Sequence, residues 1–284
     1  MSRYRFIAEQ RTAYPVRRLC AALRVSMSGF YAWLKRTPSR RAQANAALSE
    51  RIRQVHERSR QTYGYLRVHA ELRAQGERVG KHRVARLMAQ MGLQTKGRRR
   101  FKTTTQRDAR HRRAPNVLAG DFSATQLNEK WLSDITYIPT AEGWLYLAGI
   151  QDAFSRRIVG WSMRERPTKA LVCDAWKLAV GQRGVPRLHH SDQGSQYTSD
   201  AYLRLLEQDQ VVVSMSDVGR CYDNAMQESF WGTLKTECAD RPFPSRAAAR
   251  QAIFEYIELW YNRQRRHSAL GYLSPAEFEQ LHCP

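Results

Sequence analysis

"KWLSDITYIPTAEGWLYLAGIQDAFSRRIVGWSMRE", residues 130–165, contains three runs rich in β-branched and aromatic residues, with tight turns between them. The first run, 130–140, alternates apolar and polar side chains, which is typical of a strand with one buried face. The second, 143–154, is apolar and aromatic, and the third, 156–165, follows after a tight turn. Three consecutive strands joined by short turns predict an antiparallel meander.

The sequence after this stretch mixes helices with strands. We predict an amphipathic helix over 168–180 with Thr168 as its N-cap. The remaining expected elements are a strand at "RLHHS" (187–191), a helix at 199–208, a strand at 211–215, and helices at 223–240 and 245–263. This order, βββαβαβα followed by one more helix, predicts an α/β domain that is similar to the ribonuclease H-like fold. A Rossmann fold would alternate from the start and carry a Gly-rich first turn, which the sequence lacks.

The chain before residue 129 is expected to be helical. Residues 14–36 have the pattern of a helix, a short turn and a second helix. A second unit has three helical patterns, two of which end at Gly76 and Gly92, as helix C-caps commonly do. We therefore expect four parts: a helical helix-turn-helix-like region at 1–46, a second helix-turn-helix-like domain at 47–94, a basic linker at 95–128, and an α/β core with C-terminal helices at 129–284.

Positive charge is concentrated in the first part of the chain. Residues 1–120 contain 29 Lys and Arg against 6 Asp and Glu, while residues 121–284 contain 18 against 20. Clustered arginine predicts a nucleic-acid partner, because phosphates attract such clusters. Membrane binding is not expected, since no segment pairs the basic residues with a continuous apolar face, and no apolar run approaches the ~20 residues needed to cross a bilayer. The candidate DNA-binding cations here are Arg83, Arg86, Arg98, Arg99, Arg100, Lys102, Arg112 and Arg113.

The five cysteines are odd in number, scattered and free of any C-x-x-C pair. Such usage favours reduced thiols in a cytosolic protein and argues against a zinc ribbon. We therefore predict no zinc.

Three acidic residues stand out as candidates for a metal site. Asp134 lies within an apolar strand, Asp192 follows the fourth strand, and Glu228 lies on the penultimate helix. Each has a plainer explanation taken alone: an edge-strand charge, a turn residue and a surface helix residue, respectively. Taken together, acids that converge from different elements are what two Mg²⁺ ions need for phosphodiester chemistry.

The spacing of these acids resembles that of a known family. Asp192 and Glu228 are separated by 35 residues, which with "WLSDITYI" is similar to the Asp, Asp-35-Glu pattern of retroviral integrases and insertion-sequence transposases. Four longer stretches resemble the second-reading-frame product of the insertion-sequence-three family: "GWLYLAGIQDAFSRRIVGW", "HHSDQGSQYTS", "YDNAMQESFWGTLKTE" and "YNRQRRHSALGYLSPAEF". The likeness extends over 130–280 and, more loosely, over the helical part.

The resemblance implies a DDE-type transposase that cleaves DNA at insertion-sequence ends and transfers the strand. Asp134, Asp192 and Glu228 would bind Mg²⁺, with Mn²⁺ able to substitute and two ions expected. The implied partners are double-stranded DNA of terminal repeats and target, further copies of the chain on DNA, and a first-reading-frame protein or a frameshift fusion. The implied location is the bacterial cytoplasm, in association with the nucleoid.

Several other residues have open roles at this point. Lys235, two helical turns beyond Glu228, would contact DNA near the cut by resemblance. Asn262 and Arg266, with His267, fit either a DNA contact or packing of the final segment. We expect His189 and His190 to pack, Asp152, Asp217 and Asp223 to be turn residues or supporting groups, and Phe230, Trp231 and Leu234 to face the core. A DNA-binding regulator and a nuclease that cuts without joining are the rival functions.

Overall fold

The computed structural model describes residues 2–97, 114–216 and 224–282. Within these ranges the chain forms two compact units, Met1–Arg53 and Gln54–Pro284. Asp217, Asp223 and six of the candidate cations, Arg98, Arg99, Arg100, Lys102, Arg112 and Arg113, lie outside the described residues. No helix in the described ranges is both long and apolar enough to cross a membrane.

The first unit is built from short helices around a small core. α1 (Arg3–Gln10), α2 (Val16–Ala22) and α3 (Met27–Leu34) enclose the buried side chains of Ile7, Cys20 and Phe30. Ser26 caps α3 by accepting a hydrogen bond from the backbone N–H of Gly29 at 3.1 Å. The pair α2 and α3 confirms the expected helix, turn and helix, and α1 is an additional helix. α4 (Arg40–Arg58) begins in this unit and ends in the second.

The second unit begins with a helical hairpin. α5 (Tyr65–Ala74) and α6 (Lys81–Gln90) pack through buried aliphatic side chains, among them Leu72 and Val84. Gly76 and Gly92 follow these helices with φ of +86° and +66°. Both therefore act as the left-handed residues that the sequence predicts at helix ends.

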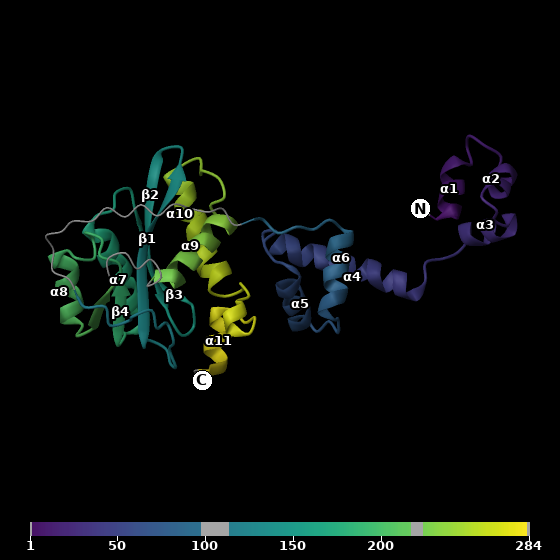
Figure 1. The fold of residues 1–284 in the computed structure, drawn as a ribbon. Helices are drawn as coiled ribbons and strands as arrows, with labels where there is room; N and C mark the ends of the chain where they lie inside the picture. The colour runs from purple at the N-terminus through teal and green to yellow at the C-terminus, as the bar shows by residue number, and fades with distance from the viewer. Residues whose placement is uncertain (1, 98–113, 217–223, 283–284) are drawn as a thin grey trace. The chain divides into compact units, whose positions relative to one another are not determined.

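A five-stranded mixed sheet follows, in the order β3-β2-β1-β4-β5 (Figure 1). Its strands are β1 (Lys130–Thr140), β2 (Gly143–Asp152), β3 (Ile158–Arg164), β4 (Leu188–Ser191) and β5 (Val212–Met215). β1, β2 and β3 pair antiparallel, which confirms the meander, whereas β4 pairs parallel with both β1 and β5. The predicted α/β fold class is thereby confirmed.

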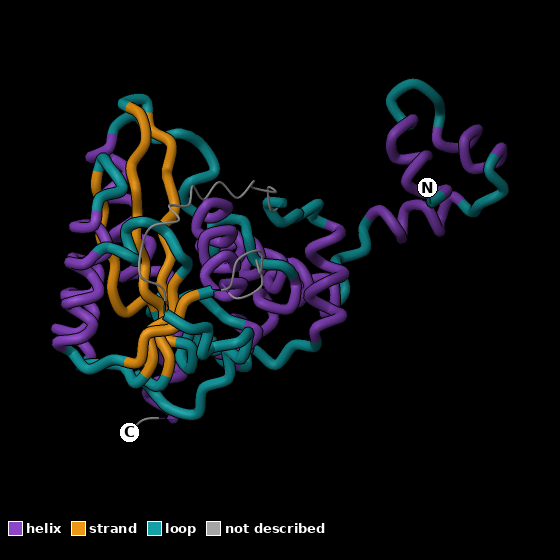
Figure 2. Tube along the Cα trace, turned by 60° about the vertical axis from the view of Figure 1, so that its left-hand side comes forward, coloured by secondary structure: helices purple, strands orange, loops and turns teal. Residues whose placement is uncertain are grey.

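Helices cover both faces of the sheet (Figure 2). α7 (Lys169–Arg183) and α8 (Asp200–Gln208) pack on one face, against Trp131 and Ala148. α9 (Ala225–Glu237) and α10 (Arg246–Glu255) pack on the other, against Leu145 and Leu147. Successive strand residues point to opposite faces, so Asp134 shares the α9 face with Leu132 and Ile138. Thr168 precedes α7 as predicted, although its side chain makes no capping hydrogen bond.

The end of the chain departs from the regular helix expected at 245–263. α10 stops at Glu255 and continues as a π-helical segment, η2 (Tyr256–Tyr261). A short 3₁₀ segment, η3 (Ser268–Leu270), and α11 (Pro275–His282) follow. The wider π turns keep Tyr256, Ile257 and Tyr261 buried against the α9 side of the sheet.

Candidate active site on the α9 face of the sheet

Asp134 lies in the middle of β1, partly exposed on the face that α9 covers. The indole N–H of Trp231 on α9 donates a hydrogen bond to Asp134 Oδ2 at 3.0 Å. Gly149 is the residue paired with Asp134 on β2. A Cβ atom at Gly149 would lie 2.8 Å from Cη2 of Trp231, so only glycine leaves room for this ring. The indole therefore reaches Asp134 because its neighbour on β2 has no side chain.

Asp192 stands next to Asp134 because of strand register. β1 and β4 run parallel with Leu132 paired to His190, and two residues further along each chain are Asp134 and Asp192. The backbone N–H of Gly194 donates to Asp192 Oδ1 at 2.9 Å. Asp192 is thus a turn residue, as the plainer interpretation proposed, and it also lies beside the strand acid.

Glu228 lies in the first turn of α9, with an exposed side chain. It precedes Trp231 by three residues, so the two share one side of the helix. The start of α9 is fixed by buried Gln227, whose amide N–H₂ donates to the carbonyls of Leu132 at 2.9 Å and Gly149 at 2.7 Å. These two bonds attach the helix to β1, two residues before Asp134, and to Gly149, the partner of Asp134 on β2.

The electrostatics of Asp134 indicate that the other two acids act on it. The pKa of Asp134 is raised to about 7, mainly by burial and further by the charges of Asp192 and Glu228. Hydrogen bonds from the backbone of Ile135 and from Trp231 oppose this rise. In the described part of the chain, no three His, Cys, Asp or Glu side chains are grouped closely enough to hold a metal ion as they stand. The side chains of Asp134 and Asp192 are the pair that the fold brings together, and Glu228 faces that pair from α9.

Lys235 lies on the same side of α9 as Glu228 and Trp231. Its Nζ is 4.9 Å from the centroid of the Tyr137 ring on β1. Burial lowers the pKa of Lys235, while the Asp134 carboxylate acts in the opposite direction. Lys235 therefore places a cation near the acidic residues, in the last turn of α9, whereas Glu228 lies in the first turn.

The two histidines before Asp192 are packed in the sheet. The ring nitrogens of His190 lie 2.9 Å from Ser214 Oγ and 3.1 Å from Ser216 Oγ. His189 Nε2 lies 2.9 Å from the Tyr202 hydroxyl, and burial lowers the pKa of His189 to about 3. Asp152 accepts hydrogen bonds from the backbone of Asn128, Phe154 and Ser155, which makes it a turn residue. All three residues have the structural roles expected of them.

Asn262 and Arg266 make structural contacts, which favours packing of the final segment among the two roles that the sequence left open for them. The side-chain amide of Asn262, 1% exposed, bonds to the backbone N–H and C=O of Ile158, each at 3.0 Å. Arg266, 8% exposed, forms ion pairs with Glu71 and Glu277, both at 2.8 Å. Its backbone N–H donates to the Tyr63 hydroxyl at 2.6 Å. Both side chains are committed to packing because their partners bury them.

The site also contains residues that the sequence analysis did not assign to it. Trp231 was expected only in the core, and Gly149 and Gln227 had no expected role. Their contacts join residues 78 to 97 positions apart. The only local signal was a tryptophan three residues after a candidate acid. Arg86 is exposed on α6 and Arg83 is partly exposed there.

Comparison with known proteins identifies the family. The integrase core domain family matches residues 124–221, a second integrase core domain family matches 209–275, and an HTH-like domain family matches 43–101. Transposase InsF for insertion sequence IS3A of Escherichia coli is 42% identical over 282 residues, covering 98% of each chain. The chain belongs to the IS3 transposase family.

Another relative and a solved structure are also similar to this chain. A 31 kDa protein of insertion element IS600 from Shigella sonnei is 45% identical over 265 residues, 92% of this chain and 97% of that protein. A solved structure of the HTLV-2 integrase catalytic core domain in complex with magnesium has a TM-score of 0.42 at 15% identity, covering 55% of this chain and 99% of that one. This IS3-family transposase is a DDE-type polynucleotidyl transferase that acts in DNA transposition.

Proposed function

We propose that Asp134, Asp192 and Glu228 are the catalytic residues with which this transposase cleaves DNA at the ends of its insertion sequence and transfers the strand. The observation that carries the proposal is the electrostatic coupling of the three acids: Asp134 lies beside Asp192, and the charges of both other acids raise its pKa. Carboxylates that repel one another are stabilised when a cation binds between them.

The donor set fits magnesium. All three side chains offer carboxylate oxygens, the hard ligands that Mg²⁺ prefers, and we propose two ions with Mn²⁺ able to replace them. Bound divalent cations would supply a polarised phosphate and a more acidic water or hydroxyl nucleophile. Trp231 orients the Asp134 carboxylate for this role, and the Gly194 N–H orients that of Asp192.

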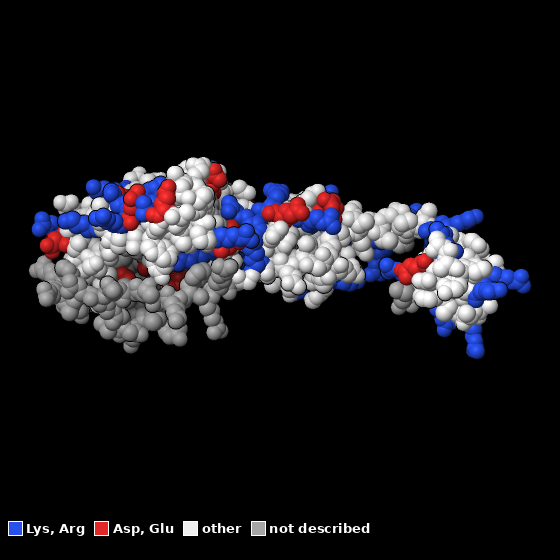
Figure 3. Space-filling model, turned by 90° about the horizontal axis from the view of Figure 1, so that it is seen from above, with Lys and Arg blue, Asp and Glu red and all other residues white. Residues whose placement is uncertain are grey.

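DNA is the expected partner of the basic residues. Figure 3 shows Lys and Arg side chains over the visible face of Met1–Arg53, with Asp and Glu few among them. We propose that these residues, together with Arg83 and Arg86 on α6 and the cations at 98–113, bind the double-stranded ends and target. Two ends must meet for transposition, so we propose that more than one copy of the chain assembles on DNA.

The test is strand transfer by variants of the three acids. Asp134→Asn, Asp192→Asn and Glu228→Gln each keep the side-chain shape while removing a charge. We expect each purified variant to fold and bind DNA but to lose cleavage and joining by at least about a thousandfold, since one group of a catalytic set is missing. Joining of a pre-cut end to target DNA with Mg²⁺ is the measurement.

The matched control is Asp174→Asn, an exposed α7 acid paired with Arg164. It should leave joining unchanged, because a surface ion pair contributes little. Retained Mg²⁺-dependent joining in any of the three variants would sink the assignment. Cleavage without joining by the wild-type chain would favour the nuclease, and DNA binding with neither reaction would favour the regulator.

Lys235 is proposed to contact a DNA phosphate near the cut. Its position over Tyr137, close to Asp134, supports this role. Lys235→Ala should reduce the slope of log affinity against log salt by about one unit, the value for one lost phosphate contact. If the variant keeps the wild-type salt dependence of DNA binding and joins DNA normally, Lys235 does not contact a phosphate.

A further inference from the structure

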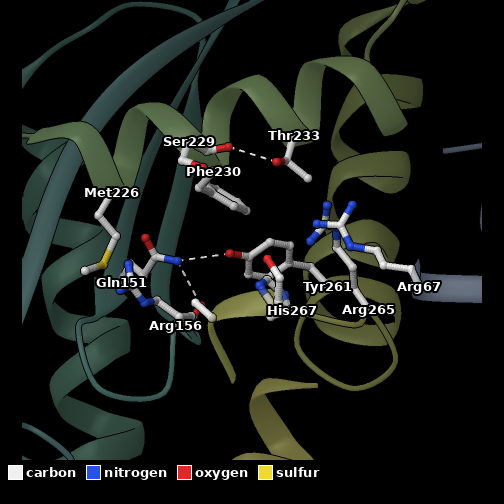
Figure 4. A pocket seen from close by; sticks show the side chains of 12 residues that line it. Arg67, Gln151, Arg156, Met226, Ser229, Phe230, Thr233, Tyr261, Arg265 and His267 are labelled. Carbon is white, nitrogen blue, oxygen red and sulfur yellow. Dashed lines mark hydrogen bonds between the residues drawn. The ribbon is translucent and has the colours of Figure 1, made fainter. Parts of the chain in front are cut away.

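A pocket lies on the side of α9 that faces away from the three acids. Its volume is about 480 Å³, which is within the range of small-molecule sites. Met226, Ser229, Phe230 and Thr233 line it from α9, at the helical spacing of a single face. Figure 4 shows Ser229, Phe230 and Thr233 above Tyr261 and His267, with Met226 to the left near Gln151. The α9 helix therefore separates two distinct sites.

The pocket is positively charged. Three arginines line it, Arg67, Arg156 and Arg265, and no acidic residue does. Arg265 is neutralised by Glu237, with Nη2 and Oε1 at 2.8 Å. Within the described part of the chain, Arg67 and Arg156 form no ion pair, and Arg67 Nε is buried without a hydrogen-bond partner. In Figure 4, Arg156 lies at one end of the pocket and Arg67 with Arg265 at the other.

Two further polar atoms at this pocket are buried without partners. His267 Nε2 has none in the described residues, although the residue is only 9% exposed. Gln151 Oε1 has none either, while the amide N–H₂ of the same side chain donates to Arg156 O at 2.9 Å and to the Tyr261 hydroxyl at 3.0 Å. Buried polar atoms normally have a partner. The unpaired His267 Nε2 and Gln151 Oε1 therefore indicate a ligand that has both hydrogen-bond acceptors and donors.

The backbone conformation and the burial of Arg156 are both unfavourable, which also indicates an anionic ligand. Its φ is +62°, a left-handed conformation that favours glycine or asparagine. Burial lowers the pKa of Arg156. Burial also lowers the pKa of His267 well below its usual value, and the charges of Arg265, Arg67 and Arg156 act in the same direction. An anion in the pocket would offset this repulsion.

We propose that this arginine pocket, formed by Arg67, Arg156, Arg265 and His267, binds a phosphate-bearing nucleotide of a DNA strand. The guanidinium groups and His267 Nε2 bind phosphate oxygens, since arginine matches phosphate geometry. Gln151 Oε1 accepts from a base N–H, and the Phe230 and Tyr261 rings contact the base. The choice of DNA as the source of the nucleotide rests on the proposed function, whereas the preference for a nucleotide does not.

The test uses the full-length chain and histidine Cε1–Hε1 NMR, with the 5′-phosphorylated dinucleotide pTpT as probe. The His267 resonance is assigned by its loss in His267→Asn. We expect pTpT to shift it saturably in the wild-type chain, and Arg156→Gln to weaken this binding about tenfold or more, as loss of a charged hydrogen bond does. Arg67→Gln provides a second variant if Arg156→Gln fails to fold. Arg204→Gln, an exposed α8 residue, removes the same charge elsewhere and should bind like the wild type.

The outcomes separate this proposal from that for the acids. Asp134→Asn should keep the His267 response while losing strand transfer. If pTpT does not shift the His267 resonance, or if Arg156→Gln and Arg204→Gln bind it equally well, the proposal that this pocket binds an anion is wrong. If inorganic phosphate binds as tightly as pTpT, the pocket recognises phosphate alone, and the proposal that it binds a nucleotide is wrong. Saturation with DNA carrying the element's own ends should abolish the pTpT response, and a response that persists in that complex would overturn the DNA source.

Discussion

At the scale of single residues, Trp231 sets the ionisation of Asp134 as well as its position. Burial and two neighbouring acids raise the pKa of Asp134, and the Trp231 N–H stabilises the charged carboxylate against them. Removing that donor must raise the pKa further, because the charged form alone loses a partner. Metal binding requires the deprotonated acid, so the indole extends the site's working range toward lower pH.

Trp231→Phe should therefore move the acid side of the pH–rate profile upward. Because a hydrogen bond to the charged carboxylate is lost, we expect the joining rate to fall off at a pH about one unit higher than in the wild type. The loss should be greatest at low pH and largely recovered at high pH. The measurement is the Mg²⁺-dependent joining rate between pH 6 and pH 9.

Trp161→Phe is the matched control, because the Trp161 indole donates to Glu258 at 2.8 Å, away from the acids. Its profile should coincide with that of the wild type. If Trp231→Phe lowers the rate equally at every pH, the indole only packs against the sheet and does not tune Asp134.

At the scale of elements, α9 is held against β1 and β2 by a close approach that glycine allows. Gly149→Ala would place Cβ 2.8 Å from the Trp231 ring, and a buried indole cannot swing away as a flexible chain does. We expect the variant to lose about 1–3 kcal/mol of unfolding free energy from overpacking. Joining should fall as well, because α9 carries Glu228. Urea unfolding and strand transfer measure the two effects.

Gly181→Ala serves as the comparison within a helix. A Cβ at Gly181 meets no atom within 4 Å, and alanine favours helix, so this variant should be neutral or slightly more stable. Equal stability of the two variants would mean that α9 shifts freely and that Gly149 is not needed for its placement.

The elements differ in how far the sequence predicts them. β1, β2 and β3 are predictable because alternation and tight turns are local. The three acids can be proposed from the sequence because their spacing is a property of the chain itself. The roles of Asn262 and Arg266 stayed open in the sequence because their partners Ile158 and Glu71 lie 104 and 195 residues away. A polar residue paired at such a distance looks the same in sequence as one that faces solvent.

At the scale of the whole molecule, charge is divided between a basic amino-terminal part and a nearly balanced remainder. Residues 1–53 alone contain 12 Lys and Arg against 2 Asp and Glu. The α5 hairpin cannot be cut from the core to test this division, because Tyr63 and Glu71 bond to Arg266. Neutralising exposed cations in place tests the same question without exposing buried surface.

Two sets of four substitutions to Gln, equal in charge lost, decide where DNA affinity arises. The amino-terminal set is Arg11, Arg17, Arg18 and Arg36, and the core set is Lys177, Arg187, Arg204 and Arg241, all exposed. Each lost phosphate contact reduces the slope of log affinity against log salt by about 0.9. We expect the amino-terminal set to reduce it by up to about 3–4 units and the core set by less than about one. Equal reductions would mean that net charge, and not its placement in the first unit, governs binding.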